Sequence, residues 1–221
     1  YSIPALSTAT GYLWSVPAGA TILSGQDSTA IVVQWAAAPG GNVCVRGLNG
    51  CGAGLQQCFP VTVFAIPTAN AGIDTALCGV DVNLAASNSI TGSTGLWIKV
   101  SGPGSAIFAN DSILNSAVTV DSNGVYQFQW TETNAICSDV DTVQVAFNAS
   151  PLGGLKQIAC DGTNQNFTVT FPISSGTPPY TVPGGNIVNG VFISDPIPNG
   201  QGYSFSITDS NGCISAAING V

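Results

Sequence analysis

Hydrophobic and polar residues alternate along most of the chain. Runs in which every second residue is apolar recur at intervals of roughly 8–15 residues, and Gly, Pro, Asn or Ser separates each run from the next. Side chains of a strand point alternately to its two faces, so these runs predict half-buried β-strands. The eight clearest runs are residues 30–35, 42–48, 59–66, 117–120, 125–130, 141–147, 166–171 and 203–208.

Helix signals are nearly absent. The longest Ala-rich stretch, residues 35–41, is broken by Pro39 and by the two glycines that end it, and none of these residues favours a helix. Many short strands at regular spacing are typical of β-sandwiches. We therefore expect an all-β fold of tandem immunoglobulin-like β-sandwich domains.

The chain also contains an internal repeat. The stretch "GYLWSVPAGATI" at residues 11–22 is echoed by "GLWIKVSGPGSAIF" at residues 95–108, and each is followed by a β-branched strand. The period of roughly 80 residues is the size of an immunoglobulin domain. Short Pro-containing segments then predict three domains, each a β-sandwich. Their bounds are residues 1–66, 67–150 and 151–221.

Charge is scarce on this chain. Only 6% of its residues are charged, against 45% hydrophobic, and the net charge is −8. So apolar a chain can bury a core, and its basic residues are too few for a nucleic-acid surface. No apolar run approaches the ~20 residues that cross a bilayer, so we expect no direct membrane insertion. Because Met, a signal peptide and a sorting tail are all missing, we interpret the sequence as a mature fragment or a window of something longer.

Seven cysteines in a chain without histidine indicate disulfides in an oxidising compartment. Paired Cys-x2–4-Cys spacings typical of structural zinc do not occur. Cys44 and Cys58 lie on neighbouring strands of one predicted hairpin and point away from its Val/Phe face, which favours a bridge between them. Cys51 at the loop tip leaves Cys51–Cys58 as the alternative.

The remaining cysteines suggest one long-range bridge in each later domain. Cys78 and Cys137 flank the second domain, and Cys160 and Cys213 stand in corresponding places in the third. Each bridge would contribute about 4 kcal/mol in the chain-entropy model. Cys51 is then the odd thiol, which we expect to be buried, in preference to being capped or paired with another chain.

No catalytic residues are predicted. Ser-His-Asp and Cys-His devices need histidine, and Glu132 is the only glutamate. Asp139 and Asp141 could supply paired carboxylates, but neighbours two apart on one strand more often form a solvated edge. With Asp209 they are also weak calcium candidates, although turn capping is the favoured role. We expect no metal and no cofactor, with calcium as the one weak alternative.

The motifs of the first domain resemble those of a known family. The stretch from Tyr1 to Gly52 resembles the PKD-like modules of Bacteroidetes surface proteins, with "YLWSVPAGATILSGQ", "IVVQW" and "NVCVRGLNGCG" in register. The resemblance implies that Tyr1 lies inside the module, whose first strand is missing. The second domain looks like the Ig-like repeats of the same proteins, and the third is similar to the SprB-type adhesin repeat. The family implies type IX secretion and extracellular display at the bacterial cell surface.

A second resemblance concerns modification. Bacteroidetes attach O-glycans to Ser or Thr in Asp-Ser/Thr pairs followed by an apolar residue or Thr. Four such pairs occur, and they give the candidate O-glycosylation sites Ser28, Thr75, Ser112 and Thr142. Attached glycans would help to keep an almost uncharged surface soluble.

These observations favour a non-catalytic structural or adhesive segment of a large secreted protein, an adhesin or fibre stalk. Its partners would be neighbouring repeats, other copies in a fibre, or surface glycans, and not nucleic acid. One alternative is a subunit of a self-assembling extracellular filament, since an incomplete first module offers an open strand edge. Another is a carbohydrate-binding module of a secreted enzyme, which needs exposed aromatics. The four tryptophans instead follow core patterns, at Trp14, Trp35, Trp97 and Trp130.

Overall fold

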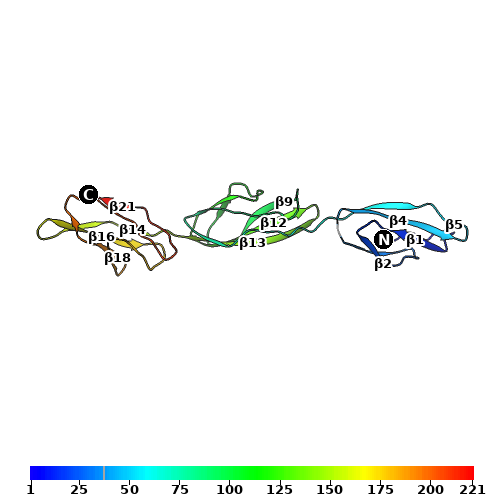
Figure 1. The fold of residues 1–221 in the computed structure, drawn as a ribbon, viewed down its shortest axis with the longest axis horizontal. Coiled ribbons are helices and arrows are strands. Elements are labelled where there is room, and N and C mark those ends of the chain that lie inside the picture. The colour runs from blue at the N-terminus through cyan, green and yellow to red at the C-terminus, as the bar shows by residue number, and fades with distance from the viewer. Residues whose placement is uncertain (37) are drawn as a thin grey trace. The chain divides into compact units, whose positions relative to one another are not determined.

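The computed structural model describes residues 1–36 and 38–221, and within them the protein consists of strands and turns without a helix. Each of the eight predicted runs contains a strand, so the all-β prediction is confirmed (Figure 1). Contacts along the chain group the residues into two compact units. Unit 1 comprises Tyr1–Ala69, Asn88–Gly95 and Thr131–Val140, and unit 2 comprises Asn70–Ser87, Leu96–Trp130 and Asp141–Val221. The three-domain division at residues 66/67 and 150/151 stays a prediction.

Unit 1 contains two antiparallel sheets. The larger is built around β4 (Gly40–Asn49), which pairs with β1 (Gly11–Ser15), β5 (Gly52–Ala53) and β6 (Gln57–Thr62). The smaller pairs β2 (Ala20–Ser24) with β3 (Val32–Trp35), and Ser2 adds a single bridge to Ala30.

The core of unit 1 lies between these sheets. Trp14 from β1 and Val43 and Val45 from β4 are almost fully buried, and Ile22, Val33 and Val61 pack against this cluster. The alternation of side chains along a strand explains why both valines are buried, because Val43 and Val45 are two residues apart and share one face of β4. The indole N–H of Trp14 donates to the Ser28 carbonyl at 2.9 Å, so the buried ring has its one donor satisfied.

The first part of unit 2 is also a two-sheet sandwich. One sheet has the order β10 (Ala106–Phe108), β11 (Ala117–Val120) and β8 (Asp81–Asn83). The other has the order β7 (Thr75–Cys78), β13 (Cys137–Asn148), β12 (Gly124–Asn134) and β9 (Thr94–Ser101). Strand β7 runs parallel to β13 and places Cys78 opposite Asn148, the last residue of β13. Three of these strands also contain residues of unit 1, namely 94–95 in β9, 131–134 in β12 and 137–140 in β13.

Aromatic rings fill this sandwich. The rings of Trp97 and Trp130 lie 5.2 Å apart, and Tyr126 meets Phe147 edge-on at 5.4 Å. The Tyr126 hydroxyl donates to the Ser122 carbonyl four residues upstream at 2.9 Å, as in the tyrosine corner of immunoglobulin-like folds. Gly102 has a φ of +134°, and a Cβ atom there would lie 2.3 Å from the Tyr126 ring, so no larger residue fits.

The second part of unit 2 is organised around β16 (Asn166–Ser174). Five further strands complete its sheet: β14 (Leu152–Gly153), β15 (Gln157–Cys160), β17 (Gly185–Val188), β18 (Val191–Ser194) and β19 (Ile197–Pro198). The last hairpin pairs β20 (Tyr203–Phe205) with β21 (Ile218–Gly220). Phe171, Phe192 and Phe205 form the centre of the core, and the Phe192 and Phe205 ring centroids are 4.8 Å apart.

Candidate functional site

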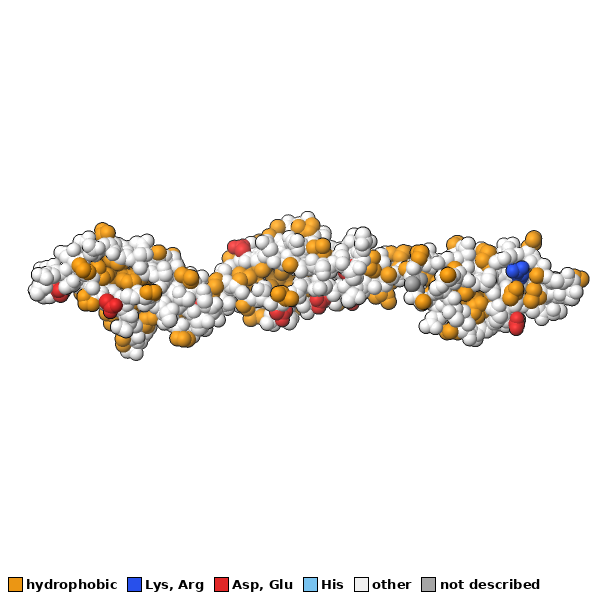
Figure 2. All heavy atoms as spheres, viewed as in Figure 1, with side chains coloured by type: hydrophobic (Ala, Val, Ile, Leu, Met, Phe, Trp, Pro, Cys, Tyr) orange, Lys and Arg blue, Asp and Glu red, His pale blue; other side chains and the backbone are white. Residues whose placement is uncertain are grey.

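The acidic and cysteine side chains of the described residues do not gather into a metal-binding cluster. Within residues 1–36 and 38–221, no three or more His, Cys, Asp or Glu side chains gather where they could hold a metal ion. Charged side chains are isolated on the face shown in Figure 2, among uncharged polar and apolar atoms. The chemistry of the chain therefore lies in its buried carboxylates, its disulfides and its exposed hydroxyl and thiol groups.

Glu132 is fully buried and acts as an anchor for a loop. Its Oε2 accepts hydrogen bonds from the backbone N–H and the hydroxyl of Ser89, both at 3.0 Å. Its Oε1 accepts from the Ile90 N–H at 3.0 Å and the Ser93 hydroxyl at 2.7 Å. Burial acts to raise the pKa of Glu132, but these four donors together outweigh burial and hold the pKa below its ordinary value. Each carboxylate oxygen is thus occupied by two donors from the chain itself.

The weak calcium candidates also bind backbone groups. Asp139 Oδ2 accepts from the Ala69 N–H at 2.9 Å, and Asp141 Oδ2 accepts from the Ala71 N–H at 2.8 Å. Each carboxylate satisfies a backbone donor of a neighbouring segment, so both have a structural use independent of any cation.

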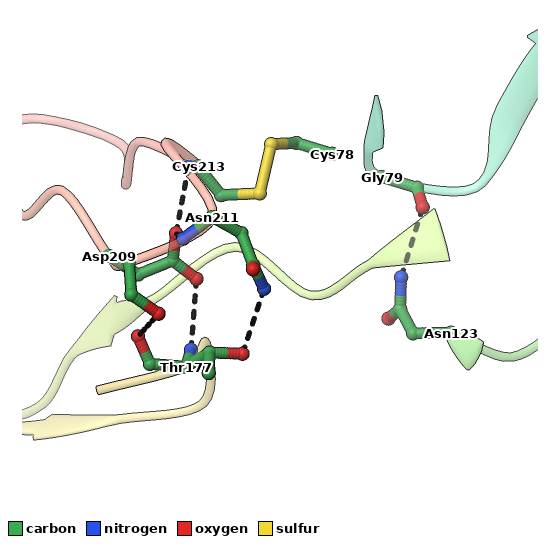
Figure 3. Close-up of a disulfide and its surroundings, with 8 residues drawn as sticks. Cys78, Gly79, Asn123, Thr177, Asp209, Asn211 and Cys213 are labelled. Carbon is green, nitrogen blue, oxygen red and sulfur yellow. Dashed lines mark hydrogen bonds between the residues drawn. A yellow bond between two sulfur atoms is a disulfide. The ribbon is translucent and has the colours of Figure 1, made fainter. Parts of the chain in front are cut away.

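Asp209 organises the turn that carries Cys213. Its Oδ1 accepts from the backbone N–H of Asn211 and of Cys213, and its Oδ2 accepts from the Thr177 N–H, all at 2.8–2.9 Å (Figure 3). Burial acts to raise the pKa of Asp209, but these three backbone donors hold it below its ordinary value. The turn needs a positive φ of +78° at Gly212. Asp209 thus performs the turn capping that the sequence favoured.

The predicted Cys44–Cys58 disulfide is present. The register of β4 and β6 places the two cysteines directly opposite each other, and a disulfide joins them. The alternative pairing of Cys51 with Cys58 is wrong. A hairpin register is a local property, which is why the spacing of the two cysteines was informative.

The predicted pairings Cys78–Cys137 and Cys160–Cys213 are wrong. A disulfide joins Cys78 to Cys213 instead, with their Cα atoms 5.5 Å apart (Figure 3). Cys137 is the first residue of the 12-residue strand β13, whereas Cys78 pairs with Asn148, the last residue of that strand. The positions of Cys137 and Asn148 are therefore about 36 Å apart along β13. A bridge tolerates a Cα separation of at most ~7 Å. Cys160 ends β15 on an exposed side, while Cys213 is fully buried against Cys78.

Three cysteines therefore remain as thiols: Cys51, Cys137 and Cys160. Cys51 is free as predicted, but it is exposed at its loop and not buried. Cys160 is exposed and Cys137 is partly buried. The count of free thiols is larger than the sequence suggested because one bridge joins cysteines that had been assigned to two.

All four candidate glycosylation residues are exposed: Ser28, Thr75, Ser112 and Thr142. Ser28 and Ser112 lie on turns, while Thr75 and Thr142 lie on β7 and β13. The Ser28 hydroxyl donates to the Ala30 carbonyl at 2.7 Å, and the Ser112 hydroxyl donates to Asp111 at 3.0 Å. Exposure makes each position accessible to a modifying enzyme.

The tryptophans do not form an exposed platform for sugars. Trp14, Trp97 and Trp130 are each at most 3% exposed, and Trp35 is partly buried with its indole N–H donating to Tyr1. A separate apolar groove of about 300 Å³ opens in unit 1 between Tyr1–Ile3 and the β6 residues Phe59–Val61. A second apolar hollow shares Ile3 and Phe59 with this groove and is also lined by Arg46.

In the part of the chain that the structure describes, no helix has the length and apolar character needed to cross a membrane. A search of curated proteins found no match. Several solved structures with tandem Ig domains match this chain. The N-terminal eight Ig domains of Down syndrome cell adhesion molecule share 11% identity over 96% of this chain and 37% of that chain, with a TM-score of 0.48. The titin I-band fragment I67–I69 shares 12% identity over 92% of this chain and 85% of that chain, with a TM-score of 0.47.

Domains 3–5 of the Drosophila OTK extracellular region share 10% identity over 96% of this chain and 85% of that chain, with a TM-score of 0.39. TM-scores this low do not identify the family of the chain. The chain spans only 37% of the length of the first of these proteins. A family model described as "PKD-like domain" matches residues 1–61. The chain therefore carries an Ig/PKD-like module at residues 1–61, within an all-β fold of immunoglobulin-like sandwiches.

Proposed function

We propose that this chain is a non-catalytic structural and adhesive segment of a large secreted bacterial cell-surface protein. The observation that carries the proposal is the combination of strand-only sandwiches with two disulfides, one of them joining residues 135 positions apart. Glu132 and Asp209, the two buried carboxylates, bind backbone groups, so neither is presented to a substrate. Two-sheet sandwiches closed by disulfides suit a segment that bears load and displays a surface.

Disulfide-containing Ig-like and PKD-like domains are typical of cell-surface and adhesion proteins, because disulfides persist in oxidising compartments. The resemblance to Bacteroidetes surface repeats extends this proposal to export by the type IX system. O-glycans at the four exposed hydroxyl residues would then cover a surface that has few charges of its own.

Protease shaving of intact cells of the source bacterium tests the proposal. Antibodies against residues 1–221 should label intact cells, and external protease should remove that label without lysis. A periplasmic protein, followed in the same samples, controls for leakage. A strain without the type IX machinery should lose the surface label. Labelling only after permeabilisation would overturn the proposed location.

A filament subunit is the second candidate, and the apolar groove between Tyr1–Ile3 and β6 favours it. Strand β6 pairs with β4 on one side, and the groove beside it is lined by Trp14, Val43 and Phe59. A strand from another copy could pair there, although Pro60 has no N–H to donate. Electron microscopy of the purified chain at rising concentration should show fibres, and monodisperse particles at every concentration would exclude them.

A further inference from the structure

The Cys78–Cys213 disulfide has a mechanical consequence that separate bridges within each domain would lack. The two cysteines are separated by 135 positions, so the bridge closes a loop that contains every strand from β8 to β20. Tension that enters the chain before Cys78 and leaves it after Cys213 passes through one covalent bond. Once the strand pairings that join β7 and β21 to the loop have broken, the residues between the two cysteines carry no tension along the backbone.

We propose that this disulfide is a tension bypass, which keeps residues 79–212 folded when the chain is pulled from its two ends. The bypass follows from connectivity, and its biological use rests on the proposed function as a load-bearing surface segment. Fully extended, the 135-position loop would span about 450–490 Å. The bridge replaces that span by a Cα separation of 5.5 Å. The disulfide therefore prevents most of the extension that unfolding of unit 2 would otherwise produce.

Both ends of the bridge are held by the surrounding structure. On one side, Gly79 directly after Cys78 donates its N–H to the Asn148 carbonyl at 2.9 Å and accepts from the Asn123 amide at 3.0 Å (Figure 3). On the other side, the Cys213 N–H donates to Asp209. Neither cysteine therefore lies on a loose tail.

The turn carrying Cys213 is itself fixed to a neighbouring loop. Ser210 donates both its N–H and its hydroxyl to the Thr177 carbonyl at 2.9 Å, and the Asn211 amide donates to the Thr177 hydroxyl at 2.9 Å. With the Asp209 contacts, these bonds hold the buried sulfur of Cys213 in one position. Force transmitted through the disulfide therefore acts on a turn that several hydrogen bonds hold in place.

Little of unit 2 lies outside the closed loop. The part of unit 2 that follows Cys213 is residues 214–221, in which β21 pairs with β20 through Ile218–Gly220. Pulling the C-terminal end can peel this short strand away, but extension then stops at Cys213. In unit 1 the Cys44–Cys58 bridge spans only 14 positions, so unit 1 retains most of its releasable length. The oxidised chain should consequently extend as though unit 2 were nearly absent.

Single-molecule force spectroscopy on the whole 221-residue chain, tethered through added handles at both ends, tests this proposal. The oxidised chain should show unfolding steps from unit 1 and only a short extension from unit 2. The Cys78→Ser/Cys213→Ser variant should add further steps that total about 450 Å of contour length. The matched Cys44→Ser/Cys58→Ser variant, which opens the short loop, should add only about 50 Å.

Chemical reduction of the tethered wild-type chain covers the case in which the double serine variant does not fold. Addition of a phosphine reductant to an oxidised molecule held under load opens both disulfides, and without any substitution it should release about 500 Å, of which about 450 Å comes from the Cys78–Cys213 loop and about 50 Å from the Cys44–Cys58 loop. Equal contour lengths before and after reduction would overturn the bypass and leave the proposed surface location standing. Conversely, a chain found inside the cell would refute the proposed function without changing the measured extension.

Discussion

Replacing Glu132 by glutamine tests whether this carboxylate anchors the loop at residues 88–93. Glutamine keeps the shape of the side chain, so no cavity forms, but its amide nitrogen cannot accept a hydrogen bond. Each carboxylate oxygen of Glu132 accepts from one backbone N–H and one hydroxyl. Whichever way the amide is placed, one backbone donor, of Ser89 or Ile90, loses its acceptor.

The size of the effect follows from those contacts. A hydroxyl can rotate to another acceptor, whereas a buried backbone N–H without a partner costs about 1–3 kcal/mol. Loss of the charge weakens the remaining bonds as well. We therefore expect the Glu132→Gln variant to lose about 3 kcal/mol of unfolding free energy at pH 7.

The pH dependence provides a second signature. The folded-state pKa of Glu132 lies below its ordinary value of 4.5, so its stabilising contribution is complete above pH 4.5 and is lost as pH falls through the folded-state pKa. The wild-type protein should thus weaken on acidification more than the Glu132→Gln variant does. The difference between the two proteins should shrink as the pH approaches 2.

Urea unfolding measures the free energy, and amide hydrogen exchange provides a local readout that does not depend on two-state unfolding. The Ser89 and Ile90 amides should exchange faster in the variant. Asp27→Asn is the matched control, since it removes one exposed carboxylate from a turn of the same unit. An unchanged unfolding free energy, together with full protection of both amides, would refute the anchoring role.

Two further predictions concern the cysteines. The Asp209→Asn substitution should loosen the turn that carries Cys213, so a thiol reductant should open the Cys78–Cys213 bridge faster than in the wild type. The Cys44–Cys58 bridge is the control and should be reduced at an unchanged rate. Equal reduction rates of Cys78–Cys213 in the two proteins would contradict this prediction. Alkylation under non-reducing conditions should label three thiols in the unfolded chain. In the folded chain the exposed thiols of Cys51 and Cys160 should react before the partly buried thiol of Cys137. Intact mass spectrometry counts these labels, and a single labelled thiol would show that the bridges differ from those described.

The strands were predictable because their signal is local. Alternation such as that of residues 125–130 fixes which side chains face the core, since the side-chain period of a strand is two. The Cys44–Cys58 bridge was predictable for the same reason, because a hairpin places its two cysteines close together without further information. The partner of Cys78 was not predictable, because the bridge depends on a long-range contact between the end of β7 and the turn that carries Cys213, 135 positions further along the chain.

The role of Glu132 was missed although a signal for it was present. Tyr126, Phe128 and Trp130 are buried, and Glu132 continues the same two-residue period on β12. A lone carboxylate on the core face of a strand must find donors, because a buried charge without them is very costly. Its donors, which belong to Ser89, Ile90 and Ser93, come from a distant loop that the sequence pattern does not connect to β12.

Disulfide mapping tests the central claim most directly. Pepsin digestion at low pH, without reductant, cleaves the chain under conditions that prevent thiol exchange, and mass spectrometry then identifies the linked peptides. The account predicts one linked pair containing Cys78 and Cys213 and another containing Cys44 and Cys58, with Cys137 and Cys160 in unlinked peptides. Peptides linking Cys78 to Cys137, or Cys160 to Cys213, would contradict it, because each domain would then carry its own bridge and tension would reach the segment between them.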